Sequence, residues 1–188
     1  MFIKKFIPKI LLNYDKEYMF IRLGFVRLFI ILMLLGGWIA ATAAPTNNDI
    51  DTKAPKVAYL IFGIIGFLVS IFIFIFNFYN IIKMDIFVDI PWEIIFLGLD
   101  FVFMCALFGT SIGCSAAEAN SRDKVIRKTV NGTSTQIITY DEVNKGTFAT
   151  AAVFGFLASI SYFILVCISV NRFLKIRKKN KQQNSPST

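Results

Sequence analysis

Four long stretches without a charged residue, broken only by one aspartate, constrain this chain of 188 residues more than any other feature. A bilayer core about 30 Å thick requires about 20 apolar residues in a helix, and backbone polar groups inside it must be satisfied within the segment. The stretches therefore predict transmembrane helices. So short a chain has too few other residues to cover four such helices with a polar layer, so we expect an all-α integral membrane protein. The stretches are residues 28–44, 57–82, 94–117 and 147–170.

The rest of the chain divides around this membrane domain, a four-transmembrane-helix bundle over residues 23–172. A basic and aromatic leader at residues 1–22 precedes this domain. The apolar residues of the leader are interleaved with Lys, as in segments that lie on an anionic leaflet. Pro8 interrupts helical periodicity there, so a flexible leader stays open. The polar, basic tail at residues 173–188 is predicted to be disordered. The predicted spans are residues 23–44, 57–82, 94–117 and 147–170.

The composition excludes several kinds of chemistry. The chain has no His and three scattered Cys, and no acidic pair lies within a predicted span. Zinc sites, Ser/His/Asp or Cys/His catalysis and thiol redox motifs each need residues that this pattern lacks. We therefore expect a protein that is not an enzyme and has no cofactor or metal. The net charge of +8 follows from membrane topology, so a nucleic-acid partner is not expected.

Basic residues flank the predicted spans unequally. Thirteen of the twenty Lys and Arg residues lie in the terminal segments and in the loop between the second and third spans. Because cytoplasmic segments carry an excess of Lys and Arg, both termini are predicted to be cytoplasmic. The sequon at Asn131, Gly132 and Thr133 agrees, since a glycan acceptor must face the lumen or the exterior. Asn131 is therefore a candidate glycosylation site.

The loop between the third and fourth spans is the larger extracytoplasmic loop. Residues 125–140 read VIRKTVNGTSTQIITY, two β-favouring runs around Asn131-Gly132, a dipeptide common in hairpin turns. This pattern predicts a small β-hairpin that packs on a neighbour, because an isolated hairpin is marginally stable in water. An irregular glycosylated loop stays an alternative.

Asp100 is the single acidic residue within a predicted span. A charge at this depth is costly, so it should face the bundle interior and have a partner. Arg27 enters the first span from the same side, and Asn77 lies near the corresponding end of the second span. We predict a structural polar cluster of Arg27, Asn77 and Asp100. A proton or ion path is the alternative, but it needs ionisable groups through both leaflets, and the outer halves show only hydroxyls.

Small residues recur at four-residue intervals in the spans. Helices in lipid associate through close packing at such residues, because lipid tails are as apolar as Leu. We predict that these residues line helix contacts inside the bundle. A self-association surface, which would give a homo-oligomer, is the alternative. The predicted packing residues are Gly36, Ala40, Gly109, Gly113, Ala151 and Gly155.

The three cysteines lie at different depths of the predicted bundle. Cys105 is mid-span, Cys114 lies near the outer end of the third span, and Cys167 lies near the cytoplasmic end of the fourth. No disulfide is expected from this placement. Cys167 is a candidate palmitoylation site at the membrane boundary; the alternative is a Cys that acts only as a small apolar residue.

With this topology, the chain resembles the MARVEL-type membrane proteins. Residues 92–101 read WEIIFLGLDF, which is similar to the fungal non-classical export, eisosome-associated branch of that family, where a Trp at the helix entrance precedes Leu-Asp-Phe by the same interval. The Ala-rich residues 151–157 and Tyr162 are similar to the last span of that branch. The resemblance covers roughly residues 20–172. The outer loop here lacks the cysteines seen in several relatives.

The resemblance implies a non-enzymatic protein that organises plasma-membrane microdomains or late secretory vesicles. Its implied partners are sterol- or sphingolipid-rich membrane and other membrane proteins, and the basic leader adds anionic inner-leaflet lipids. The long spans also suit the thicker bilayer of the late secretory pathway. Two alternatives stay open: an accessory subunit of a larger membrane complex, and a small transporter or channel component. The transporter is disfavoured because the halves do not repeat and no predicted span contains Pro.

Overall fold

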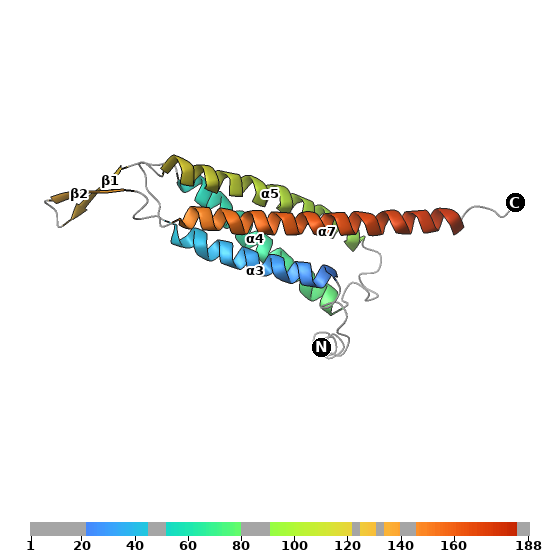
Figure 1. Cartoon of the computed structure of the whole chain (residues 1–188). Coiled ribbons are helices and arrows are strands. Elements are labelled where there is room, and N and C mark those ends of the chain that lie inside the picture. The colour runs from blue at the N-terminus through green and yellow to red at the C-terminus, as the bar shows by residue number, and fades with distance from the viewer. Residues whose placement is uncertain are drawn as a thin grey trace, which may run out of the picture.

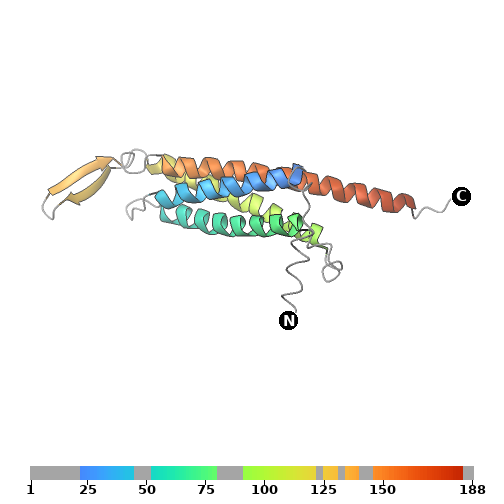
Figure 2. The ribbon, with the colours of Figure 1, turned by 90° about the horizontal axis from the view of Figure 1, so that it is seen from below.

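The computed structural model describes residues 22–44, 52–79, 91–121, 125–130, 134–139 and 146–183. These residues form four long helices, packed side by side as an elongated bundle, and two short strands beyond one end of it (Figures 1 and 2). The elements are α3 (Arg22–Ala43), α4 (Lys53–Phe78), α5 (Trp92–Ser121), β1 (Val125–Val130), β2 (Ser134–Thr139) and α7 (Thr147–Gln183).

Each of the four helices is long and apolar enough to cross a bilayer, which confirms the four predicted helices. Large apolar side chains cover the outside of the bundle as well as its core; Phe25, Leu68 and Val153, for example, are more than half exposed. This distribution suits a bundle whose outer surface meets lipid tails. The candidate spans are Leu23–Ala43, Lys53–Phe78, Trp92–Asn120 and Thr147–Lys175.

The start of α4 differs from the prediction, which began the span at the first residue after the charged Lys56. α4 begins at Lys53, four residues before the predicted span, and Pro55 lies within its first turn. Proline is tolerated there because the first N–H groups of a helix have no intrahelical acceptor. α4 ends at Phe78, and the predicted residues 80–82 lie outside the described residues. α5 begins immediately after Pro91, whose carbonyl accepts hydrogen bonds from the N–H groups of Ile94 and Ile95.

The prediction of a disordered tail from residue 173 is wrong for residues 173–183. α7 continues without a break to Gln183. The membrane span supplies the helix nucleus, so each further residue adds a hydrogen bond at the cost of fixing only itself. Lys, Arg, Gln and Leu are good helix formers, and no Gly or Pro occurs between Arg172 and Gln183. Residues 1–21 of the leader and residues 184–188 of the tail lie outside the described residues.

The helices are arranged as a ring in the order α3, α4, α5, α7, so that α3 lies diagonally opposite α5 and α4 lies diagonally opposite α7. We call the end where α3 and α5 terminate the hairpin end, and the opposite end, beyond which α7 projects, the tail end (Figures 1 and 2). The core of the hairpin end is built mainly from alanines around Tyr59 and Phe148. Larger side chains, among them Ile30, Phe103 and Tyr162, fill the core toward the tail end.

The segment predicted as a hairpin contains the antiparallel strands β1 and β2. Their pairing runs from Val125 opposite Thr139 to Val130 opposite Ser134. Asn131 and Gly132, which carry the predicted turn and the glycosylation site, lie outside the described residues.

Candidate functional site: a buried polar layer

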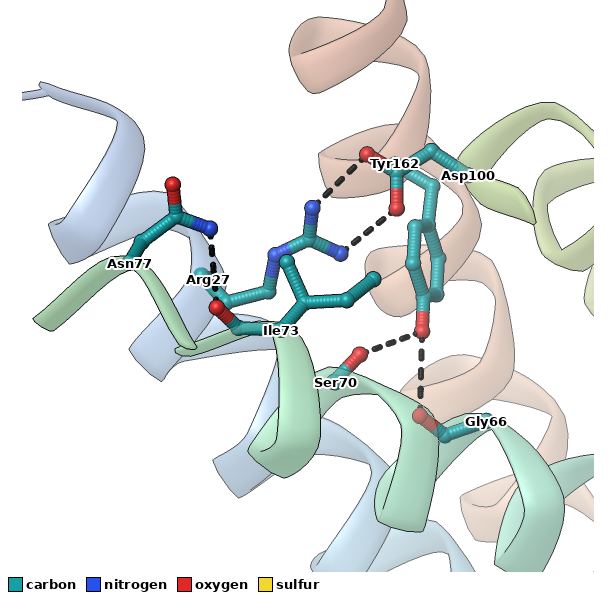
Figure 3. A network of polar contacts seen from close by, with 7 residues as sticks. All are labelled: Arg27, Gly66, Ser70, Ile73, Asn77, Asp100 and Tyr162. Atoms are coloured by element: carbon teal, nitrogen blue, oxygen red, sulfur yellow. Dashed lines mark hydrogen bonds and ion pairs between the residues drawn. The ribbon is translucent and has the colours of Figure 1, made fainter. Parts of the chain in front are cut away.

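The centre of the candidate site is an ion pair between Arg27 and Asp100. Arg27 lies in the second turn of α3 and Asp100 in the third turn of α5. The two guanidinium NH groups donate to the two carboxylate oxygens, Nη1 to Oδ1 at 2.5 Å and Nη2 to Oδ2 at 2.7 Å (Figure 3). The side chains are only 6% and 4% exposed. The pair therefore joins two diagonally opposite helices through the interior of the bundle.

The bidentate geometry explains how two charges can be buried at this depth. Removing an ion from water is expensive, and the cost is offset only when the partner is close and several hydrogen bonds are made. A charge left alone in the interior of a bundle costs about 3–5 kcal/mol. Removing either side chain would therefore leave the other as an unpaired buried charge.

A second polar bridge crosses the other diagonal at the same level. Tyr162 on α7 and Ser70 on α4 share a hydrogen bond of 2.6 Å between their hydroxyl oxygens, and Tyr162 also donates to the carbonyl of Gly66 at 3.3 Å (Figure 3). The guanidinium carbon of Arg27 lies 6.0 Å from the centre of the Tyr162 ring. This places both bridges in one layer, which we call the polar layer: Arg27, Ser70, Asp100 and Tyr162.

Asn77 is not part of this layer, contrary to the sequence prediction. Its amide nitrogen donates to the carbonyl of Ile73 in the preceding turn of α4, at 2.8 Å (Figure 3). Asn77 lies two turns from Ser70, about 10 Å along the helix, so its own backbone supplies a nearer acceptor. The sequence pattern thus found two of the layer's four residues. A Tyr buried within a span usually finds a hydrogen-bond partner, and this was the signal in the sequence that could have drawn attention to Tyr162.

Two glycines make room for Tyr59 in the core of the hairpin end. A Cβ atom added to Gly155 would lie 2.7 Å from Cε2 of Tyr59 and would overlap Oγ of Ser111, and one added to Gly37 would overlap the Tyr59 hydroxyl. Among the described residues, the buried hydroxyls of Tyr59 and Ser111 have no hydrogen-bond partner. Among the described residues, Tyr59 and Ser111 are therefore held by close packing.

The predicted packing residues fall into two groups. In the first group, Gly36 lies against Phe154, and an added Cβ would lie only 3.0 Å from the ring. Gly155 is enclosed as described above. Ala151 is fully buried in the core of the hairpin end, and Ala40 packs against that core. In the second group, Gly113 meets only Pro55, at 3.7 Å.

Gly109 does not pack inside the bundle, contrary to prediction. An added Cβ there would meet nothing within 4 Å. The reason is the rotation of α5, which turns Leu107, Ser111 and Cys114 inward and Gly109 outward. Gly37, which lies against the Tyr59 hydroxyl, was not predicted because the four-residue spacing selected Gly36.

Lys56 connects α3 and α4 at the hairpin end. Its ammonium group donates to the carbonyl of Thr42 at 3.3 Å and to the carbonyl of Ala44. The last carbonyls of a helix have no intrahelical partner, so a cation at this position both satisfies them and complements the helix dipole. Sequence reasoning counted Lys56 only as a loop charge.

Aromatic side chains connect α4 and α5 at the tail end. The ring centre of Trp92 lies 5.7 Å from that of Phe76 and 5.6 Å from that of Phe96, and Phe76 also contacts Phe72 at 4.0 Å. Tryptophan is enriched where a helix passes from lipid tails to headgroups. Trp92, the first residue of α5, is typical of that boundary.

The three cysteines are free thiols. Cys114 is buried, and its thiol lies 3.9 Å from the carbonyl oxygen of Pro55, whereas Cys105 and Cys167 are exposed. Within the part of the chain that the structure describes, no three His, Cys, Asp or Glu side chains gather as a metal-binding group.

Comparison with known proteins found no match to the chain among protein-family models, curated proteins or solved structures.

Proposed function

We propose that this chain is a non-enzymatic, MARVEL-like membrane-organising protein of the plasma membrane or of late secretory vesicles. The observation that carries the proposal is that the polar layer joins all four helices through buried contacts. The Arg27–Asp100 pair is bidentate, with side chains 6% and 4% exposed, and connects α3 to α5. The Ser70–Tyr162 hydrogen bond connects α4 to α7. A layer of this kind holds a bundle together, which is what a scaffold in the membrane requires.

The rest of the described core favours a scaffold over a transporter. A proton path needs a chain of ionisable groups across both leaflets. In the hairpin-end half, the buried polar side chains near Tyr59 are hydroxyls and one thiol, set among alanines and glycines. The buried carboxyl described in that half, Glu118, lies in the last turn of α5, about 27 Å along the helix from Asp100. No described helix is broken in its middle, whereas transporter sites are typically built on discontinuous helices.

The proposal places both termini in the cytoplasm, with the hairpin end outside. Support comes from the excess of Lys and Arg in the segments at the tail end. Candidate spans of 26 and 29 residues suit a thick, sterol- and sphingolipid-rich bilayer. Two modifications belong to this proposal: a glycan on Asn131, and an acyl chain on Cys167, which is exposed on α7 five residues before Arg172.

An ion-flux assay separates a scaffold from a channel component. The full-length protein is reconstituted in liposomes, and proton and cation flux are compared with those of empty liposomes. We expect no difference. Flux above the background that disappears in an Asp100→Asn variant, while the amount of inserted protein stays the same, would contradict the proposal.

Imaging and copurification test the organising role itself. A C-terminally tagged protein should gather in surface patches that exchange slowly after photobleaching, and it should crosslink to copies of itself. An even surface distribution with fast exchange would count against an organiser. One-to-one copurification with a different polytopic protein would instead identify an accessory subunit.

A further inference from the structure

We propose that the part of α7 that projects beyond the bundle, residues 172–183, binds the headgroup of a ring-phosphorylated inositol lipid in the adjacent leaflet. The inference deepens the proposed function and rests on the cytoplasmic position of the tail end. It depends on a finding that the sequence did not predict, namely that α7 remains helical through Gln183. Figures 1 and 2 show this segment projecting past the other three helices.

No acidic residue of α7 balances the charge of the extension. The extension contains six basic residues and no acidic one, and the whole of α7 contains no Asp or Glu. Arg172 and Lys175, the first two basic residues of the extension, are exposed. Like charges three or four residues apart on a helix repel each other. This repulsion favours a bound anion, and a cluster of four to eight Lys or Arg next to a span is typical of segments that bind anionic lipids.

Arg172 and Lys175 fall at the depth of the headgroup layer, and Lys179 falls just beyond it. Arg172 is the first charged residue of α7; at 1.5 Å per residue, Lys175 lies about 4.5 Å and Lys179 about 10 Å farther along the axis. The headgroup layer is roughly 5–8 Å thick on each side of the bilayer, and the screening length at physiological salt is about 8 Å. These residues therefore lie within electrostatic reach of lipid phosphates without any bend in the helix.

The helical register groups three of the charges on one face. At 3.6 residues per turn, positions 172, 175 and 179 fall within an arc of about 60°, whereas positions 177 and 181 fall on the opposite side. We call Arg172, Lys175 and Lys179 the basic stripe. Three basic positions in line over two turns suit one headgroup that carries several phosphates better than separate headgroups with a single charge each.

The experiment uses the full-length protein in detergent micelles, titrated with lipid and observed by native mass spectrometry. The lipids are phosphatidylinositol bisphosphate, phosphatidylserine at equal total charge, and phosphatidylcholine. The stripe variant is Lys175→Gln with Lys179→Gln. The control variant, Arg177→Gln with Lys181→Gln, removes the same charge from the opposite face. Equal thermal unfolding midpoints in phosphatidylcholine establish that both variants fold.

We expect the wild-type protein to prefer the bisphosphate lipid, and the stripe variant to lose about tenfold or more in affinity for it. The control variant should lose less than about threefold. An Ile176→Pro variant, which keeps every charge but breaks the helix within the stripe, should also bind more weakly. Equal loss in the stripe and control variants, equal affinity for phosphatidylserine, or unchanged binding by Ile176→Pro would overturn the proposal. A result of this kind would leave the ion-flux and imaging tests of the proposed function untouched.

Discussion

At the scale of single residues, the bundle contrasts polar groups that are paired with polar groups that are not. In the polar layer, Arg27 pairs with Asp100 through two hydrogen bonds, and Ser70 pairs with Tyr162. Tyr59, in the hairpin-end core, is equally buried but has no hydrogen-bond partner among the described residues. A buried hydroxyl without a partner costs about 1–3 kcal/mol, whereas a hydrogen-bonded one contributes about 1 kcal/mol. The same substitution should therefore have opposite effects at the two tyrosines.

Replacing Tyr162 by Phe should lower the free energy of unfolding by about 1 kcal/mol, because Ser70 and the Gly66 carbonyl lose their partner. Replacing Tyr59 by Phe should raise it or leave it unchanged, because a desolvated hydroxyl is removed without loss of a bond. Thermal unfolding of the two variants in the same detergent measures both effects. Destabilisation by Tyr59→Phe as large as that by Tyr162→Phe would contradict the assignment.

The ion pair predicts a strongly non-additive pair of substitutions. Asp100→Asn and Arg27→Gln should each reduce the free energy of unfolding by about 3–5 kcal/mol, because each strands a buried group. The double variant Arg27→Met with Asp100→Leu should recover most of that loss, since an apolar pair of similar size needs no desolvation. Folded yield and unfolding midpoint provide the readout. If Asp100→Asn behaves as wild type while Arg27→Gln does not fold, the two residues do not act as a pair.

At the scale of the helices, hydropathy along the chain predicted where the four helices lie. It did not predict features that depend on contacts between helices or on the helix backbone itself. The four helices follow from long uncharged runs, and the Arg27–Asp100 pairing follows from the cost of a lone charge in a span. The rotation of α5 depends on which side chains fit against α7, so the spacing of Gly109 and Gly113 could not reveal that Gly109 faces outward. Asn77 was misplaced because its own helix backbone competes for its amide. The continuation of α7 depends on a helix already nucleated in the membrane.

The rotation of α5 and α7 is tested by a matched pair of Gly→Ala substitutions. Gly155→Ala places a methyl group 2.7 Å from the Tyr59 ring, and such overpacking should cost about 1–3 kcal/mol. Gly109→Ala meets open space and should be neutral or stabilise the helix by up to about 1 kcal/mol. Unfolding midpoints in one detergent compare them directly. Equal destabilisation at the two positions would show that Gly109 is enclosed after all.

At the scale of the whole molecule, the bundle is apolar outside, joined inside by the polar layer, and extended at one end by a basic helix. The candidate spans, the paired charges and Trp92 at the start of α5 all fit a bundle that crosses a bilayer. Its orientation, proposed above with both termini in the cytoplasm, decides which leaflet the extension of α7 meets and whether Asn131 can receive a glycan. It is therefore the claim on which the proposed function and the lipid site both depend.

Epitope labelling of intact cells tests this orientation most directly. One tag is inserted between β1 and β2, after Gly132, and a second tag is fused after Thr188. Four crossings with a cytoplasmic tail predict that antibody labels the inserted tag on intact cells and labels the C-terminal tag only after the membrane is permeabilised. Labelling of the C-terminal tag on intact cells, or of both tags under the same condition, would contradict the account.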